Sequence, residues 1–143
     1  MTELSKETLE SYNSEIAKYE WKVLTFLIAE DVDINYQILA EGLKKTNVTI
    51  YWAKNGKETI ELFNKHKDIK LILTDLQMPE MDGFEATRKM REINNKIPII
   101  AYTAYAYEGV SEKILLAGAN ECLLKPFANK KLLNTIRKYL FVT

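Results

Sequence analysis

The stretch LILTDLQMPEMDG, residues 71–83, predicts a buried strand that ends abruptly at the carboxylate of Asp75. Apolar and β-favouring residues precede this acid, and a Met-Pro step and a second acid, Asp82, follow it. A strand that is apolar almost throughout is typical of a parallel sheet with helices on both faces. In such sheets ligands bind beyond the carboxyl ends of the strands, so Asp75 is expected at a binding edge.

Segments of two kinds alternate along the rest of the chain. Asp82 is placed to cap a helix that begins at residue 83, and Gly118 to end another helix in a left-handed conformation. Five strands alternating with five helices predict an α/β fold, a single doubly wound parallel sheet with helices on both faces. We expect strands at 22–29, 48–53, 69–74, 97–103 and 121–124, and helices at 34–43, 57–66, 83–93, 108–119 and 129–141.

The composition is that of one globular domain. Of the 143 residues, 47% are hydrophobic and 28% are charged, and 20 basic side chains balance 20 acidic ones. Lys and Arg form no track for direct nucleic-acid contact, and no apolar run suits direct membrane contact. One cysteine and one histidine exclude a disulfide framework and a Cys/His zinc site within one chain. We therefore expect a cytoplasmic domain at residues 20–143, preceded at 1–19 by a linker or tail, or by a helical stub.

Polar side chains gather where the predicted strands end. The first strand runs into Glu30 and Asp31, the third into Asp75, the fourth into Thr103 and the fifth into Lys125. Three carboxylates at one edge repel one another unless a cation lies among them, and such oxygen ligands suit Mg²⁺ or Mn²⁺. A lysine and a hydroxyl beside them suit a phosphoryl group. Since no cysteine, histidine or serine joins the set, Asp75 is the best candidate for a nucleophile that forms an acyl phosphate.

Four motifs in this order and spacing resemble those of response-regulator receiver domains of two-component signalling. The resemblance extends from about Trp21 to Leu140, and the forms DLQMPEMDGFEATRKMR and EDVDINYQIL are most similar to receivers of hybrid sensor histidine kinases. It implies a flavodoxin-like fold with strand order 2-1-3-4-5. The motifs are LIAEDVDIN (27–35), LILTDLQMPEMDG (71–83), PIIAYTA (98–104) and LLKPF (123–127).

The resemblance also implies a role for each site residue. Asp75 would be the phosphoacceptor and, with Asp31 and the backbone carbonyl of Gln77, a ligand of Mg²⁺, for which Mn²⁺ could substitute. Glu30 would act on the metal through water. Thr103 would bind the phosphoryl oxygen and move with it, Lys125 would pair with the phosphoryl group, and the bond before Pro126 would be cis.

The implied partner is a histidine kinase or a histidine phosphotransfer domain. It would dock on the first predicted helix, 34–43, and on the loop after Lys125, while output would leave through the face of the fourth helix, fifth strand and fifth helix. One position departs from the family pattern, because Cys122 stands where the family often has a Tyr or Phe that swings inward. Tyr102, Tyr105 and Tyr107 are hypothetical replacements for that aromatic residue.

Other functions stay open at this stage. The chain could be the receiver of a hybrid kinase, so that a longer membrane-anchored parent would be the enzyme, or it could be a stand-alone response regulator. The D-x-D of Asp31 and Asp33 also resembles the haloacid-dehalogenase superfamily, which suggests a small Mg²⁺-dependent aspartyl phosphohydrolase. Against that interpretation, Asp33 is expected to open a helix and Asp75 would be left without a role. A receiver that only binds partners is a further alternative, although no site residue is missing.

Overall fold

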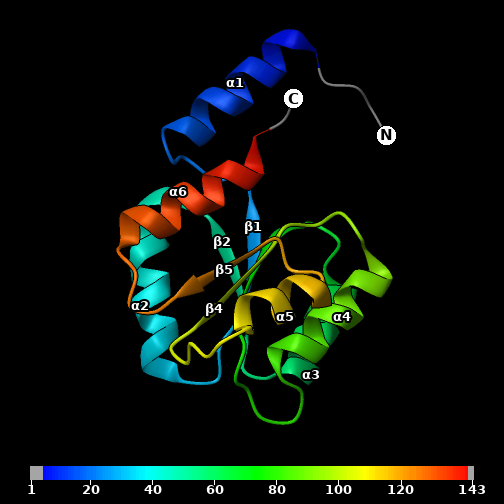
Figure 1. The fold of residues 1–143 in the computed structure, drawn as a ribbon. Coiled ribbons are helices and arrows are strands. Elements are labelled where there is room, and N and C mark those ends of the chain that lie inside the picture. Colours follow the sequence, from blue (N-terminus) through cyan, green and yellow to red (C-terminus); the bar gives the residue numbers. More distant parts are fainter. Residues whose placement is uncertain (1–4, 142–143) are drawn as a thin grey trace.

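Five strands pair in parallel in the order β2-β1-β3-β4-β5, which confirms the predicted topology (Figure 1). The computed structural model describes residues 5–141. All of β1 is buried, β3 is buried except at Lys70, and β2 is a partly exposed edge strand. The strands are β1 (Thr25–Ala29), β2 (Thr49–Ala53), β3 (Ile69–Asp75), β4 (Ile99–Thr103) and β5 (Glu121–Leu124).

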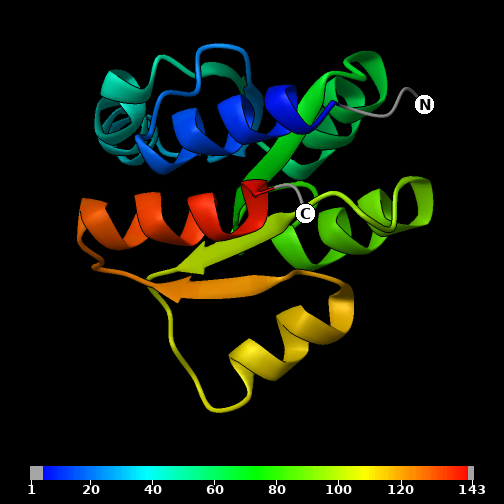
Figure 2. The same cartoon turned by 90° about the horizontal axis from the view of Figure 1, so that it is seen from above.

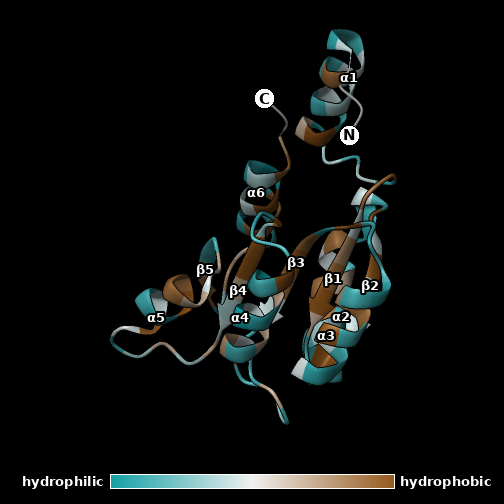
Figure 3. Ribbon diagram, turned by 90° about the vertical axis from the view of Figure 1, so that its right-hand side faces the viewer, coloured by the Kyte–Doolittle hydropathy of each residue, from teal (hydrophilic) through white to brown (hydrophobic). Residues whose placement is uncertain are grey.

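Helices cover both faces of this sheet, as the alternating pattern predicts. Figure 1 shows α2 and α6 on one side of the sheet and α3, α4 and α5 on the other, and each side has its own apolar core. In Figure 3 the central strands are mostly hydrophobic in colour, while the outer turns of the helices are largely hydrophilic. Each predicted helix is observed, with slightly different ends. The observed helices are α2 (Asp33–Leu43), α3 (Gly56–Lys65), α4 (Gly83–Ile93), α5 (Val110–Ala117) and α6 (Asn129–Leu140), with a 3₁₀ turn, η1, at Lys44–Thr46.

The expected helix ends are also present. Asp82 Oδ1 accepts a hydrogen bond of 2.9 Å from the backbone N–H of Glu85 at the start of α4. Gly118 ends α5 with φ at 118°, a left-handed value that a residue without a Cβ adopts readily. These caps fix the start of α4, just after the loop that follows Asp75, and the end of α5, just before β5.

A helix precedes the sheet, so the predicted count of five helices is corrected to six within residues 5–141. Helix α1 (Lys6–Ala17) begins at Ser5, whose side chain accepts from the N–H of Thr8, and it buries Ile16 against the α2–α6 side of the core. The ring of Trp21, fully buried after α1, lies 5.7 Å from that of Phe26. Figure 2 shows α1 running beside α6. The helix forms because its apolar side can pack there, and no helix within residues 5–141 has the length and apolarity to cross a membrane.

Candidate functional site

The parallel strands bring the predicted strand-end residues to one edge of the sheet. Ala29 of β1 is in register with Thr74 of β3, so Glu30, which follows β1, lies beside Asp75, the last residue of β3. Lys125 follows β5 directly, and its peptide bond to Pro126 is cis. Residues that are far apart in the sequence, such as Glu30 and Lys125, therefore meet at this edge.

Three carboxylates and one ammonium group form the centre of the site. One oxygen each from Glu30, Asp31 and Asp75 lies within 4.8 Å of the other two. The Nζ of Lys125 lies 3.6 Å from Glu30 Oε1 and 3.9 Å from Asp75 Oδ2. Within residues 5–141, Lys125 is the lysine that pairs with these acids, and the cluster retains an excess of negative charge that a divalent cation would balance.

Burial makes this excess charge costly. The side chain of Glu30 has no exposed surface and that of Asp75 is 12% exposed. Burial raises the pKa of the Asp75 carboxyl, the N–H of Gln77 and the ammonium of Lys125 oppose the shift, and the charge of Asp31 adds to it. Burial likewise raises the pKa of Glu30. For both acids the largest cause is burial, which disfavours the charged form, and Lys125 offsets only part of it.

The backbone around Asp75 fixes the orientation of its carboxylate. The N–H of Gln77 donates to Oδ1 at 3.1 Å, and the N–H of Gly83 donates to the carbonyl of Leu76 at 3.0 Å, which closes the loop between β3 and α4. A Cβ on Gly83 would lie 2.2 Å from the carbonyl oxygen of Asp75. Only glycine permits this approach, so the glycine of the MDG motif is required by packing behind the acid.

Glu30 is held by three donors, two of them on aromatic side chains. Its Oε2 accepts from the N–H of Val32 at 3.1 Å, and its Oε1 accepts from the hydroxyl of Tyr102 at 3.0 Å. Its backbone carbonyl accepts from the indole N–H of Trp52 at 2.8 Å. Neither aromatic residue is predicted in this role from the sequence, because the strand pattern marks both only as sheet residues and does not show which distant group their polar atoms meet.

Thr103 and Gln77 lie beside the cluster. Thr103 is 1% exposed, and its Oγ1 accepts from the N–H of Tyr105 at 3.0 Å. Gln77, Asp31 and Tyr105 line an open hollow of about 490 Å³ next to the acids. The site therefore opens to solvent between the β3–α4 loop and the β4–α5 loop.

Two other sequence observations are resolved by position. Asp33 is the first residue of α2, and its side chain, 75% exposed, lies 3.8 Å from Lys54 Nζ, so it does not complete a second acidic pair with Asp31. Cys122 packs against the core on the α3–α5 side, whereas Tyr102 belongs to the core on the α2–α6 side. Tyr102 therefore lies on the opposite side of the sheet from Cys122.

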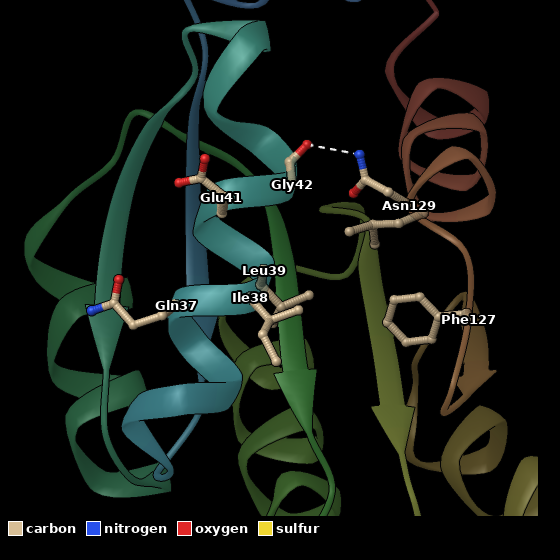
Figure 4. A pocket seen from close by; sticks show the side chains of 8 residues that line it. Gln37, Ile38, Leu39, Glu41, Gly42, Phe127 and Asn129 are labelled. Carbon is tan, nitrogen blue, oxygen red and sulfur yellow. Dashed lines mark hydrogen bonds between the residues drawn. The ribbon is translucent and has the colours of Figure 1, made fainter.

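A second feature near the site is an apolar groove between α2 and α6. Figure 4 shows Ile38 and Leu39 of α2 facing Phe127, which follows Pro126, and Asn129 donating to the carbonyl of Gly42 at 3.0 Å. The groove has a volume of about 600 Å³. Ile38 is 64% exposed at its rim, which is unusual for a large apolar side chain and leaves this side of α2 available for contact.

Known proteins share this architecture. The response regulator receiver domain family matches residues 26–137. Hybrid signal transduction histidine kinase I of Dictyostelium discoideum is 39% identical over 115 residues, 75% of this chain but 7% of the kinase. The polar-differentiation response regulator DivK of Brucella anthropi is 31% identical over 116 residues, 80% of this chain and 94% of DivK. The chain spans between 7% and 14% of the length of the Dictyostelium kinase and of three other kinases that it matches.

Solved structures of receiver domains also resemble this chain. A chain in the co-crystal structure of the Saccharomyces cerevisiae histidine phosphotransfer protein Ypd1 with the receiver domain of its downstream response regulator Ssk1 superposes with a TM-score of 0.74. It is 30% identical, and the alignment covers 81% of this chain and 88% of the other. The relatives thus include both receivers within kinases and a receiver that makes up nearly a whole protein.

Proposed function

Since this chain belongs to the response regulator receiver domain family, and is a receiver of two-component phosphorelay signalling, we propose that Asp75 accepts the phosphoryl group from a partner's phosphohistidine. The observation that carries the proposal is the position of Asp75. It is a buried carboxylate at the end of the central strand β3, with the ammonium of Lys125 3.9 Å from one oxygen and two further acids beside it.

The donor set fits Mg²⁺, with Mn²⁺ as a substitute. Asp31 and Asp75 offer carboxylate oxygens close to that of Glu30. By resemblance to the family, the backbone carbonyl of Gln77 would be the remaining protein ligand and Glu30 would act through water. An all-oxygen set that is short of positive charge suits these hard cations. The bound cation would neutralise charge on the phosphoryl oxygens during transfer.

The protein's own groups then have separate tasks. A carboxylate oxygen of Asp75 forms the new O–P bond as the N–P bond to the donor histidine breaks, and the histidine nitrogen keeps the bonding electrons. The ammonium of Lys125 holds the phosphoryl oxygens. The hydroxyl of Thr103, which lies 3.5 Å from the carbonyl oxygen of Tyr105 as a donor, donates to one of the phosphoryl oxygens instead. Positioning and electrostatic stabilisation supply most of the rate enhancement in such transfers.

The groove between α2 and α6 is the proposed docking site for the phosphodonor. A helical histidine phosphotransfer domain would lay an apolar stripe against Ile38 at the rim of the groove, with Phe127 at the far wall. Ile34, one turn earlier on α2, is also 64% exposed and would extend this contact. The groove adjoins the acidic cluster because Phe127 follows Lys125 and Pro126. A downstream protein would instead contact the α5–β5–α6 face, where Leu115, Leu116 and Leu124 are exposed.

The proposal also covers the longer protein to which the domain belongs. We assign it to a hybrid sensor histidine kinase in the cytoplasm, on the strength of relatives such as the Dictyostelium kinase, and the stand-alone arrangement of DivK is the alternative. The phosphoacceptor role is the same in either case.

Phosphorylation is tested with acetyl phosphate. Incubation with and without Mg²⁺, followed by intact mass measurement, should give a single phosphoryl adduct that depends on Mg²⁺ and is absent from Asp75→Asn. An absence of adduct in every condition would refute the phosphoacceptor mechanism.

Docking is tested with a phosphorylated histidine phosphotransfer domain as donor. Ile38→Glu should slow transfer from this donor at least tenfold and leave labelling by acetyl phosphate unchanged, because the small donor does not need the groove. Val23→Glu is the matched control. Val23 is 69% exposed and precedes the amino-terminal end of β1, whereas the acidic cluster lies at the carboxyl ends of the strands. Equal rates for the two variants would exclude the groove as the docking site.

A further inference from the structure

Tyr102 reaches the acidic cluster from the interior of the protein. It lies in β4, has no exposed surface, and donates its hydroxyl to Glu30 Oε1 at 3.0 Å, with the carbonyl of Ala29 at 3.2 Å. Strand β3 lies between β4 and β1 in the sheet, so the side chain spans the width of the central strand. A buried hydroxyl that meets a buried carboxylate so far across the sheet is a specific arrangement and not a result of strand alternation alone.

Packing fixes the ring that carries this hydroxyl. The ring of Phe127 meets that of Tyr102 edge to face, with centroids 6.4 Å apart, and Lys125 Nζ lies 4.8 Å from the centroid of the Tyr102 ring. Tyr102 therefore contacts both members of the Glu30–Lys125 ion pair. With the ring held, its hydroxyl oxygen stays within hydrogen-bond distance of Glu30 Oε1 and of the Ala29 carbonyl, and Glu30 Oε1 is the nearer acceptor.

Lys125 is shared between two acids, which makes a second donor on Glu30 important. Its Nζ lies between Glu30 Oε1 at 3.6 Å and Asp75 Oδ2 at 3.9 Å. When Lys125 turns to a phosphoryl group on Asp75, Glu30 loses its nearest positive charge while it is still fully buried. A carboxylate left there without donors would be strongly destabilised. The hydroxyl of Tyr102 and the N–H of Val32 continue to hold its two oxygens.

The geometry points to Tyr102 as a positioning residue of the phosphoacceptor site: its hydroxyl keeps the Glu30 carboxylate in one orientation toward the metal position and frees Lys125 for the phosphoryl group. This assignment rests on the proposed function, since it concerns the same cluster. Hydrogen-bond partners of groups around a metal commonly change metal affinity by about 10–100-fold when they are removed.

The test is Tyr102→Phe, which removes the hydroxyl and keeps the ring. Calorimetric titration with Mg²⁺ alone should show about tenfold weaker binding than the parent, and the rate of labelling by acetyl phosphate at saturating Mg²⁺ should fall severalfold. Tyr139→Phe is the matched control, because its hydroxyl also donates to a backbone carbonyl, that of Asn120 at 3.3 Å, but lies on α6 away from the cluster. Its Mg²⁺ affinity should equal that of the parent.

A double-mutant cycle separates positioning from general destabilisation. In a Glu30→Gln background the Tyr102→Phe change should weaken Mg²⁺ binding by less than a third of its effect in the parent, because the carboxylate it positions is gone. Equal effects in the two backgrounds would overturn the assignment. Tyr102→Leu also lacks the hydroxyl and keeps an apolar side chain at position 102 of the core. It provides a second variant if Tyr102→Phe does not fold, and the same outcomes apply to it.

The outcomes also separate this inference from the proposed function. A parent that binds Mg²⁺ and is phosphorylated, with Tyr102→Phe within twofold of it in affinity and rate, would refute the positioning role and leave the proposed function intact. A parent that neither binds Mg²⁺ nor accepts a phosphoryl group would refute both.

Discussion

Replacing Asp75 by asparagine is expected to stabilise the protein in the absence of metal, although it removes the proposed reactive group. The change removes one charge from a cluster in which oxygens of Glu30 and Asp31 lie within 4.8 Å of one on Asp75, and among the described residues Lys125 is the cation paired with it. The amide oxygen of asparagine can still accept the hydrogen bond that the N–H of Gln77 now donates to Oδ1. The substitution therefore deletes repulsion and preserves the local loop structure.

The size of the effect follows from the distances. At an effective dielectric constant of about 20, two like charges 4.8 Å apart repel by about 3.5 kcal/mol, and the ammonium at 3.9 Å attracts by about 4 kcal/mol. Two repulsions against one attraction leave about 2–3 kcal/mol of net repulsion on Asp75. Because Asp31 is only half-buried and is screened by water, we expect the free energy of unfolding to rise by about 1–3 kcal/mol.

The assay is urea unfolding of parent and variant at pH 7 with a chelator present, and thermal unfolding should show a midpoint about 2–4 °C higher per kcal/mol. Asp33→Asn is the control, since Asp33 is exposed and outside the cluster, and its effect should stay within about 0.5 kcal/mol. Mg²⁺ at ten times its Kd should stabilise the parent by about 1.4 kcal/mol and the variant by less.

The stabilisation by Asp75→Asn is expected to increase with pH. Burial raises the pKa of Asp75 above its ordinary value of 3.8, so the native carboxyl keeps its proton to higher pH than the unfolded one. Below pH 3.8 the carboxyl of the parent is protonated in both the native and the unfolded state, so Asp75→Asn is little more stable than the parent. As the pH rises through the raised pKa, the free energy of unfolding of the parent falls. The stability difference between variant and parent reaches its full size above the raised pKa. A variant that is equal to or less stable than the parent at pH 7 without metal would refute the account of repulsion at the cluster.

Three further changes test how the fold supports the site. Gly83→Ala should cost about 1–3 kcal/mol in urea unfolding and slow labelling by acetyl phosphate, because the new Cβ would lie 2.2 Å from the carbonyl oxygen of Asp75; a variant as stable and as fast as the parent would contradict that packing. Trp21→Ala should cost about 3–5 kcal/mol by the same measurement, because the indole is fully buried where α1 joins the sheet, and a loss below about 1 kcal/mol would mean that α1 is not part of the cooperative unit. Asn55→Ala should cost about 1 kcal/mol, since its Oδ1 caps α3 by accepting from the N–H of Glu58 at 2.8 Å, and amide exchange in the first turn of α3 should speed up accordingly; unchanged exchange there would exclude the cap.

Local patterns in the sequence are sufficient to predict the sheet and the charged residues at the centre of the site. Apolar runs that alternate with amphipathic segments specify strands and helices, and parallel strands necessarily deliver their carboxyl ends to one edge. For that reason the strand-end acids and the lysine are predicted to lie together from the sequence alone. The residues that cluster as expected are Glu30, Asp31, Asp75 and Lys125. Asp82 and Gly118 are predictable because a cap depends on residues only a few positions away.

Other features depend on contacts between distant residues. Helix α1 buries Ile16 alone of its residues, and this side chain packs in the core on the α2–α6 side. Cys122 and Tyr102 follow similar strand patterns, yet one packs on the α3–α5 side and the other extends across the sheet to Glu30.

The difference has a physical basis. Periodicity and capping reflect interactions within a few residues, so the sequence by itself determined the fold class, the edge that carries the acids and the identity of Asp75 as the central carboxylate. Which polar atom meets which depends on strand register, on the neighbours of each strand and on the rotamer that packing allows. Those quantities are decided only when all five strands and their helices pack together, and they give Glu30 the hydroxyl of Tyr102, a residue 72 positions away, as its partner.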